Sequence, residues 1–171
     1  TAQHVEDQLG TKIPYILDGG QCSIGIESTI IGFDENEKPI IYRLGGKKID
    51  DIENIVGRVK LKIIHSSDPM APGMLKTHYA PSKRLIIGHL DMLIKRFQNR
   101  NFGVISYHQK FDDLPSDKQI ALSPGKDLNE AARNLFGALR LMDQKNIDMI
   151  ITERFPDEGL GQAINDRLKR A

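Results

Sequence analysis

The segment from residue 66 to residue 82 divides this chain of 171 residues into two parts. It contains three prolines and one glycine, and it reads SSDPMAPGMLKTHYAPS. Proline has no backbone N–H and clashes with the preceding helical turn, so neither a regular helix nor a central strand is expected here. We therefore expect a long linker. Ordered loops of this length tend to be functional, and a passive flexible tether is the simpler alternative.

The part after the linker alternates strand-like and helix-like patterns. Apolar, β-branched runs occur at 84–88, 102–107, 119–122 and 147–152. Helical spacing of apolar residues follows at 90–97, after Asp127, and after Gly159-Leu160-Gly161. Asp127 and Glu130 have the spacing of a capping box. This order predicts a parallel sheet with right-handed crossovers, that is, a small Rossmann-like three-layer α/β domain over residues 83–171.

The part before the linker is shorter and mixed. Thr1 is the predicted N-cap of a helix that ends at Gly10. Three β-rich runs follow at 15–18, 28–33 and 39–43, and the last two predict a hairpin. A helix over 49–57 and a strand over 61–64 complete this part. Elements this few cannot bury a core alone, so we expect partner strands that are missing from residues 1–65.

Charge and cysteine content exclude several classes of protein. The 24 basic and 23 acidic residues give no global field toward nucleic acid or an anionic membrane. The one candidate tRNA-binding patch is the basic run 167–170, which is more typical of a helix C-terminus. The lone Cys22 and the lack of metal-ligand spacing predict no metal site and a reducing cytoplasm. No apolar run is long enough to span a membrane.

Several tempting signals have simpler interpretations. Gly159-Leu160-Gly161 lacks the third glycine of a nucleotide loop and follows acidic residues, which favours tight packing of the helix start over phosphate binding. Glu153, at a strand end, is interpreted as an ion-pair partner of Arg154 or Arg167 instead of a catalytic acid. Cys22 has no nearby histidine to act as a base, which argues against a nucleophile.

A set of motifs distributed along the chain resembles a known family. The motifs are Asp18-Gly19-Gly20, Gly25-Ile26-Glu27-Ser28-Thr29, Tyr42-Arg43-Leu44-Gly45, the linker segment 72–81, Asn134-Leu135-Phe136-Gly137-Ala138-Leu139-Arg140, and the final segment 161–171. In this order they resemble the C-terminal half of the YrdC-like catalytic domain, the linker and the accessory domain of the long-form threonylcarbamoyl-AMP synthases.

The resemblance implies an enzyme that condenses L-threonine, bicarbonate and ATP into threonylcarbamoyl-AMP and releases pyrophosphate. ATP would be a substrate, with Mg²⁺ carried on the nucleotide, and tRNA and tRNA-modification proteins would be candidate partners. Residues 1–65 would be the C-terminal part of a twisted YrdC-like α/β sheet, 66–82 a linker or lid, and 83–171 the accessory domain. The family's Lys-x-Arg nucleotide motif would precede Thr1, so we expect a C-terminal fragment that is inactive alone.

The resemblance also implies roles for individual residues, although it identifies no catalytic residue. Ser28 and Thr29 would bind threonine through their hydroxyls, with a structural role as the alternative for Thr29. Arg43 would hold an ATP phosphate with its planar fork, and a surface ion pair is the alternative. The linker would close over the ligand and exclude water. Its predicted ATP-binding residues are His78 and Tyr79, and its predicted lid residues are Pro72, Gly73 and Lys76.

Two other functions stay open at this stage. The part after the linker would serve as an accessory module that docks on protein or on tRNA, and tRNA binding would weaken steeply with salt. A stand-alone nucleotide-binding α/β domain is the third interpretation, and it predicts a phosphate at a helix N-terminus.

Overall fold

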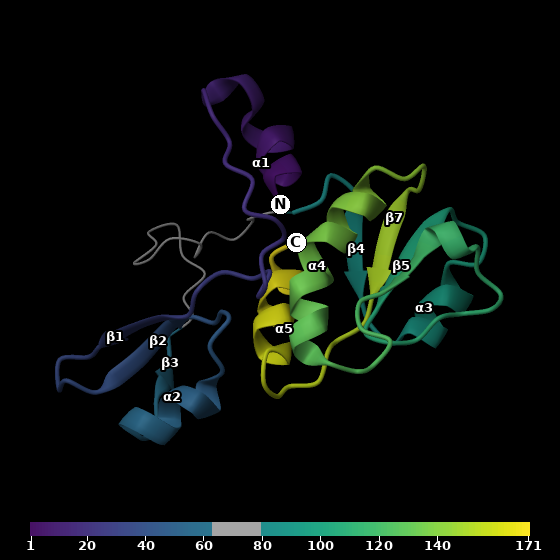
Figure 1. Ribbon diagram of the computed structural model, residues 1–171. Coiled ribbons are helices and arrows are strands. Elements are labelled where there is room, and N and C mark those ends of the chain that lie inside the picture. Colours follow the sequence, from purple (N-terminus) through teal and green to yellow (C-terminus); the bar gives the residue numbers. More distant parts are fainter. Residues whose placement is uncertain (63–79) are drawn as a thin grey trace.

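The computed structural model describes residues 1–62 and 80–171, which form a small sheet and a large sheet with their helices (Figure 1). The predicted linker therefore lies almost wholly outside the described residues. The first region contains α1 (Ala2–Leu9), a 3-10 turn at Gly10–Lys12, β1 (Ile30–Phe33), β2 (Pro39–Arg43), α2 (Ile49–Val56) and β3 (Lys60–Leu61). β1 and β2 pair antiparallel, and β2 pairs parallel with β3.

Most of the expected elements of the first region are confirmed. The Thr1 hydroxyl accepts a hydrogen bond from the backbone N–H of His4, and Gly10 ends α1. The hairpin of β1 and β2 closes through a turn in which the Asp34 carboxylate accepts from the backbone N–H groups of Asn36 and Lys38, both at 2.9 Å. Local capping and turn chemistry were therefore sufficient to predict these elements.

The strand expected over residues 15–18 is absent from the described structure, and that prediction was wrong. Tyr15 and Leu17 are 85% and 95% exposed, and no described strand pairs with this segment. A β-rich sequence forms a strand only where a neighbouring strand satisfies its backbone groups and covers its side chains.

The second region is a parallel α/β unit of three layers. Its strands are β4 (Arg84–Ile87), β5 (Phe102–Ser106), β6 (Gln119–Ala121) and β7 (Met149–Thr152), and its helices are α3 (Leu90–Arg96), α4 (Leu128–Asp143) and α5 (Gly161–Lys169), with a 3-10 turn at Ser116–Lys118. The sheet order is β4-β7-β5-β6, and every pairing is parallel. Helix α3 covers one face, and α4 and α5 cover the other (Figure 1).

Burial on both faces explains the apolar runs of this sheet. All five residues of β5 are buried, as expected for a central parallel strand. Leu90 and Leu93 of α3 pack on Val104 and Ile151, while α4 and α5 pack on the opposite side chains Ile105 and Ile150. The expected strand and helix alternation is thus confirmed.

The start of α4 differs from the predicted capping box. Asp127 is the N-cap and accepts from the backbone N–H of Asn129 at 2.7 Å. The backbone N–H of Asp127 donates to the Ser123 hydroxyl, and that hydroxyl donates to Glu130. The Ser123 hydroxyl therefore bridges the backbone of Asp127 and the side chain of Glu130. Ser123 is fully buried, so its hydroxyl proton and oxygen both need partners within the protein.

The start of α5 confirms tight packing at Gly161. A Cβ at this position would lie 1.9 Å from the carbonyl oxygen of Pro156, so no residue except glycine fits without a backbone shift.

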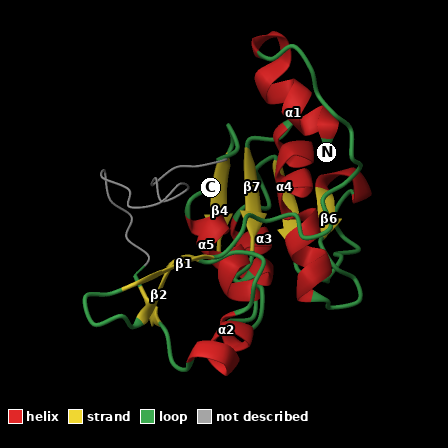
Figure 2. Cartoon of the chain, turned by 60° about the vertical axis from the view of Figure 1, so that its left-hand side comes forward, coloured by secondary structure: helices red, strands yellow, loops and turns green. Residues whose placement is uncertain are grey.

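One apolar core joins the two regions. Ile26, Ile41, Leu44 and Ile52 of the first region belong to the same buried cluster as the inner faces of α4 and α5. In Figure 1 and Figure 2, α5 lies on the side of the large sheet that faces the small sheet. The first region therefore obtains its core by packing against the second.

Candidate functional site

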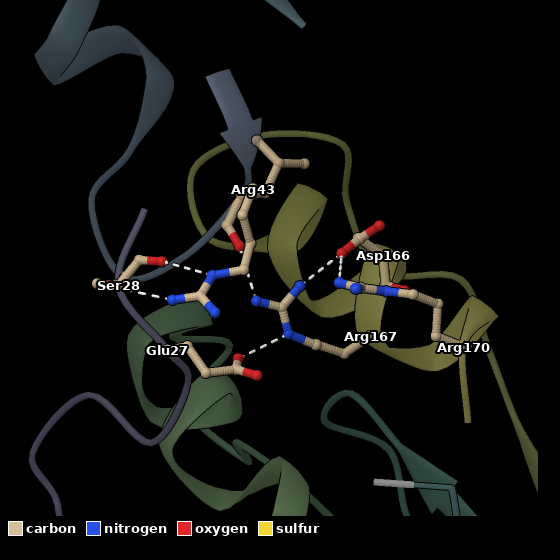
Figure 3. Close-up of polar contacts among 7 residues, drawn as sticks. Glu27, Ser28, Arg43, Asp166, Arg167 and Arg170 are labelled. Atoms are coloured by element: carbon tan, nitrogen blue, oxygen red, sulfur yellow. Dashed lines mark hydrogen bonds and ion pairs between the residues drawn. The ribbon is translucent and has the colours of Figure 1, made fainter. Parts of the chain in front are cut away.

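Two predicted site residues, Ser28 and Arg43, meet in the structure. Arg43 is the last residue of β2, and Ser28 lies just before β1. The Arg43 guanidinium donates from Nε to the Ser28 carbonyl oxygen and from Nη2 to the Ser28 hydroxyl, both at 3.0 Å (Figure 3). Because the hydroxyl accepts from Arg43, its own proton points away from the guanidinium and is suited to a ligand carboxylate.

Backbone packing brings these two segments together. A Cβ on Gly45 would lie 2.3 Å from both the Glu27 carbonyl oxygen and the Ser28 carbonyl carbon. The backbone N–H of Gly46 donates to the Glu27 carbonyl oxygen at 2.8 Å. Since any side chain at position 45 would push residues 27–29 away, the Ser28 and Arg43 pairing depends on glycine there.

The hydroxyl of Thr29, the other residue predicted to bind threonine, is engaged with the backbone. It donates to the Lys47 carbonyl oxygen at 2.8 Å and accepts from the Lys47 N–H at 3.1 Å. This contact supports the structural alternative considered for Thr29. A ligand would find this oxygen only as an acceptor, because its proton is already used.

A buried arginine from the second region reaches the residues next to this pair. Arg167 of α5 donates from Nε to the Glu27 carboxylate at 2.7 Å and from Nη2 to the Leu44 carbonyl oxygen at 2.8 Å (Figure 3). Burial opposes ionisation of Glu27, but the adjacent charge and hydrogen bond of Arg167, with Arg43 nearby, outweigh it and leave the pKa of Glu27 below its usual value. Glu27 is therefore an ionised partner at neutral pH.

A large open cavity lies beside the pair. Its volume is about 1040 Å³, and its described lining comes mainly from α1, residues 21–27 and α4, including the exposed Cys22 and Arg133, with residues 80–81 and part of β6. Neither Ser28 nor Arg43 is among the described lining residues, although Glu27 is. The chemistry of the Ser28 and Arg43 pair therefore defines the candidate site better than the size of this cavity.

A protein-family model for the C-terminal domain of threonylcarbamoyl-AMP synthase matches residues 48–171. The chain belongs to this family. Its relatives include the threonylcarbamoyl-AMP synthases of Pyrococcus abyssi, 35% identical over 188 residues, and of Bacillus subtilis, 34% identical over 180 residues. These alignments cover 100% and 99% of this chain but 53% and 52% of the relatives. The chain thus spans about half the length of the relatives it matches.

Solved structures of the synthase family agree with this fold over the whole chain. The crystal structure of P. abyssi Sua5 complexed with L-threonine has a TM-score of 0.86 and 35% identity, and it is matched over 100% of this chain and 53% of its own. A P. abyssi Sua5 variant in which an adjacent histidine and tyrosine are both alanine has a TM-score of 0.82 and 32% identity, with coverages of 100% and 52%.

The basic run 167–170 of this synthase family member lies at the C-terminal end of α5, as the favoured interpretation expected, and it is not a surface patch for tRNA. Arg167 and Arg170 are 4% and 6% exposed, and both bind the Asp166 carboxylate. Of the three basic residues, only Lys169 is exposed. Acceptors distant in sequence, such as Glu27, bury these charges, and no local pattern signals that.

The predicted ion pair of Glu153 was also assigned to the wrong partners. Its carboxylate accepts from the backbone N–H of Tyr107 at 2.7 Å, which connects the ends of β5 and β7. Arg154 pairs with Asp157 at 3.1 Å, and Arg167 pairs with Glu27. Parallel neighbouring strands bring Tyr107 and Glu153 together although they lie 46 residues apart.

The remaining predicted site residues of the synthase lie outside the described residues. They are His78 and Tyr79, predicted to bind ATP, and the lid residues Pro72, Gly73 and Lys76. Within residues 1–62 and 80–171, no three His, Cys, Asp or Glu side chains gather to hold a metal ion. In the same part of the chain, no helix has the length and apolar character needed to cross a bilayer.

The sequence motifs contain both Glu27 and Arg167, but Glu27 had no predicted role and the predicted partner of Arg167 was Glu153. The available signal was weak: each residue belongs to a family motif next to residues with predicted roles. Only the three-dimensional arrangement shows that these two motifs contact each other.

Proposed function

We propose that this chain is part of an enzyme that forms threonylcarbamoyl-AMP from L-threonine, bicarbonate and ATP, with release of pyrophosphate, for tRNA modification. Family membership supports the reaction, and the L-threonine complex of the P. abyssi relative supports the amino-acid substrate. The observation that carries the proposal is the contact of Arg43 with Ser28. It brings the residue predicted to bind ATP next to the residue predicted to bind threonine.

In this proposal Ser28 donates its hydroxyl proton to the carboxylate of threonine. Arg43 orients that hydroxyl and adds a positive charge close to it, which favours an anionic ligand. The same guanidinium has five N–H donors in a planar fork, which suits an ATP phosphate near the bound amino acid. Thr29 holds the polypeptide in place through Lys47 and would offer a ligand only an acceptor.

The proposed organisation follows the family. Residues 1–65 are the C-terminal part of the YrdC-like catalytic domain, 66–82 the linker, and 83–171 the accessory domain. The proposal places Mg²⁺ on the nucleotide phosphates, because this ion is commonly held by substrate phosphates together with one or two carboxylates.

The linker would cover the nucleotide and exclude water, since water would hydrolyse the carboxylated threonine or the mixed anhydride. His78-Tyr79 is the only place in the sequence where a tyrosine directly follows a histidine. A P. abyssi relative has been solved with a histidine and the tyrosine after it both replaced by alanine, which is consistent with a functional role for such a pair. The proposal assigns His78 and Tyr79 that role at the nucleotide. Pro72, Gly73 and Lys76 belong to the same proposed lid.

Calorimetric titration of L-threonine tests the proposal. We expect Ser28→Ala to weaken threonine binding about tenfold or more, because a hydrogen bond to a charged group contributes about 1.5–3 kcal/mol. Ser116→Ala, an exposed serine in the 3-10 turn before β6, is the matched control and should bind as the unchanged chain does. Equal affinities in all three proteins would refute the role of Ser28.

Titration of ATP tests the proposed assignment of the nucleotide step. Because the chain spans about half the length of its relatives, the proposal assigns ATP-dependent pyrophosphate release to the complete protein. We expect weak or undetectable ATP binding by residues 1–171 and pyrophosphate release only with additional upstream sequence. Tight ATP binding or turnover by residues 1–171 would contradict this assignment.

A further inference from the structure

We propose that Arg167 is a positioning residue of the synthase, through which α5 of the second region holds the Ser28 and Arg43 pair in place. This inference rests on the proposed function for the meaning of the pair, but its geometry stands alone. Glu27 directly precedes Ser28, and Leu44 directly follows Arg43. Arg167 binds both of these neighbours, so one side chain fixes the two segments that carry the pair (Figure 3).

The guanidinium of Arg167 uses its three nitrogens on three different acceptors. Nε donates to the Glu27 carboxylate at 2.7 Å, Nη2 to the Leu44 carbonyl oxygen at 2.8 Å, and Nη1 to the Asp166 carboxylate at 2.5 Å. Its side chain is 3% exposed, so these bonds form in an environment of low dielectric. A lysine at this position would offer a single nitrogen and would not reach all three acceptors in the same planar geometry.

Asp166 and Arg170 extend the set of buried charges around Arg167. The Asp166 carboxylate, itself buried, binds both Arg167 and Arg170. The cluster therefore contains two carboxylates, Glu27 and Asp166, and two guanidiniums, and its charge is balanced. Balanced and hydrogen-bonded charges are tolerated in a protein interior, whereas removal of one member leaves an uncompensated buried charge.

The pair has limited support within its own region. Gly45 and Gly46 pack against the backbone of residues 27–29, and this fixes the two segments relative to each other. Their placement relative to the large sheet depends on α4 and α5. Gly25 contributes a second close contact, because a Cβ there would lie 2.3 Å from the Cα of Arg133 in α4. Arg167 adds hydrogen bonds and an ion pair to these packing contacts, and it does so next to the residues proposed to bind substrate.

Positioning through a neighbour has a measurable consequence. A displacement of about 1 Å at a substrate-orienting group is enough to lower an enzymatic rate by two orders of magnitude. Loss of Arg167 should therefore weaken threonine binding even where the fold persists. The cluster thus explains why buried arginines occur near the C-terminus of a helix that contains none of the predicted substrate-binding residues.

The experiment compares Arg167→Met and Arg167→Lys with Ile164→Val in the 171-residue chain. Ile164 is a fully buried residue of α5 without polar contacts, so Ile164→Val is a matched control that perturbs packing alone. The structural readout is hydrogen exchange of the Gly46 amide, which donates to the Glu27 carbonyl, relative to amides of β5 and β7. The functional readout is the dissociation constant of L-threonine.

We expect Arg167→Met to speed exchange at Gly46 about tenfold or more while β5 and β7 stay protected, and to weaken threonine binding by a similar factor. Arg167→Lys keeps the positive charge beside Glu27. Its exchange rate at Gly46 and its dissociation constant for threonine should lie between those of Arg167→Met and of the unchanged chain. Ile164→Val should leave both readouts unchanged after correction for its lower melting temperature.

Unchanged exchange at Gly46 in both Arg167 variants would overturn the inference, and so would equal losses in Ile164→Val at matched stability. If Arg167→Met does not fold, the Gly46 exchange and the threonine binding of Arg167→Lys are compared with those of Ile164→Val, and the same criteria apply. A chain that binds no threonine in its unchanged form would refute the threonine-binding role proposed for Ser28 in residues 1–171, whereas the Gly46 amide would still decide whether Arg167 positions the pair.

Discussion

The two regions of this molecule obtain their stability differently. Residues 80–171 bury their own sheet between helices, and Leu135, Met142 and Ile150 have no exposed surface. Residues 1–62 leave large apolar side chains exposed, with Phe33 at 68% and Ile55 at 81%. Four apolar residues that the first region does bury, Ile26, Ile41, Leu44 and Ile52, pack in the same cluster as α4 and α5. The second region is therefore a scaffold, and the first region depends on it.

The proposed substrate residues lie in the dependent region, close to the scaffold. Ser28 and Arg43 belong to residues 1–62, whereas the side chain that binds their neighbours, Arg167, belongs to α5. A site on short elements that are supported from outside is sensitive to changes in the support. The dependence of the first region on the second should therefore also affect the proposed site, which can be tested by perturbing each region in turn.

The largest expected effect comes from the shared core. Leu135→Ala removes a fully buried side chain of α4 and should lower the free energy of unfolding by about 2–5 kcal/mol. Because the core is common to both regions, we expect both to lose structure in one denaturant transition. Circular dichroism and amide exchange of residues 40–43 should follow the same curve.

Leu141→Ala is the control for this prediction. Leu141 lies on the same helix but is 55% exposed, so its replacement should change the stability by no more than about 0.5 kcal/mol. Loss of the large sheet in Leu135→Ala while β1 and β2 stay folded would contradict the dependence of the first region on the second.

A smaller and more local effect is expected at Gly45. Gly45→Ala places a Cβ against the backbone of residues 27–29 and should destabilise by about 1–3 kcal/mol. The damage should concentrate in the first region, with faster amide exchange at Thr29 and Gly46 and intact protection in β5. Gly125→Ala, where nothing lies within 4 Å, should leave exchange unchanged. Uniform loss of protection in both regions would argue against separable local stability.

The smallest expected effect is the pH dependence of the Glu27 contact. The pKa of Glu27 lies below its ordinary value of 4.5, so its ionised form stabilises the folded protein above that pH. This contribution should disappear as the pH falls through the lower pKa of the folded state. The charges near the Glu27 carboxylate are Arg167, Arg43 and, through Arg167, Asp166.

Glu27→Gln isolates this contribution. The variant should be less stable at pH 7, and the difference in free energy of unfolding from the unchanged chain should shrink as the pH is lowered from 5 toward 3. Asp34, Asp127 and Asp143, whose pKa values are also lowered, are present in both proteins and cancel in the difference. A difference that does not change with pH would show that folding leaves the pKa of Glu27 at its ordinary value.

Local patterns in the sequence predicted most of the secondary structure. Thr1, Gly10 and Asp127 cap their helices as expected, and alternating strands and helices correctly indicated a parallel sheet in the second region. These features depend on residues three or four apart, or on the period of apolar side chains. The strand predicted over residues 15–18 was wrong because a strand requires a neighbouring strand, and no local pattern specifies that partner.

The candidate site was predictable only in part. The motifs identified Ser28 and Arg43, and the structure confirms that these residues contact each other. Their individual roles in binding threonine and ATP stay predictions. The motifs did not reveal that the Thr29 hydroxyl serves Lys47, or that Ser123 stands between Asp127 and Glu130. In each case the hydroxyl bonds to groups that only the folded backbone brings within reach.

By itself the sequence determined the family, the order of helices and strands, and the residues of the motifs, since all of these are encoded by neighbours along the chain. The tertiary structure alone decided which charges are buried and with whom they pair. Glu27 and Arg167 are 140 residues apart, so no local pattern in the sequence pairs them. Their contact exists because the shared core packs α5 against the small sheet, and in that low-dielectric setting each charge requires the other.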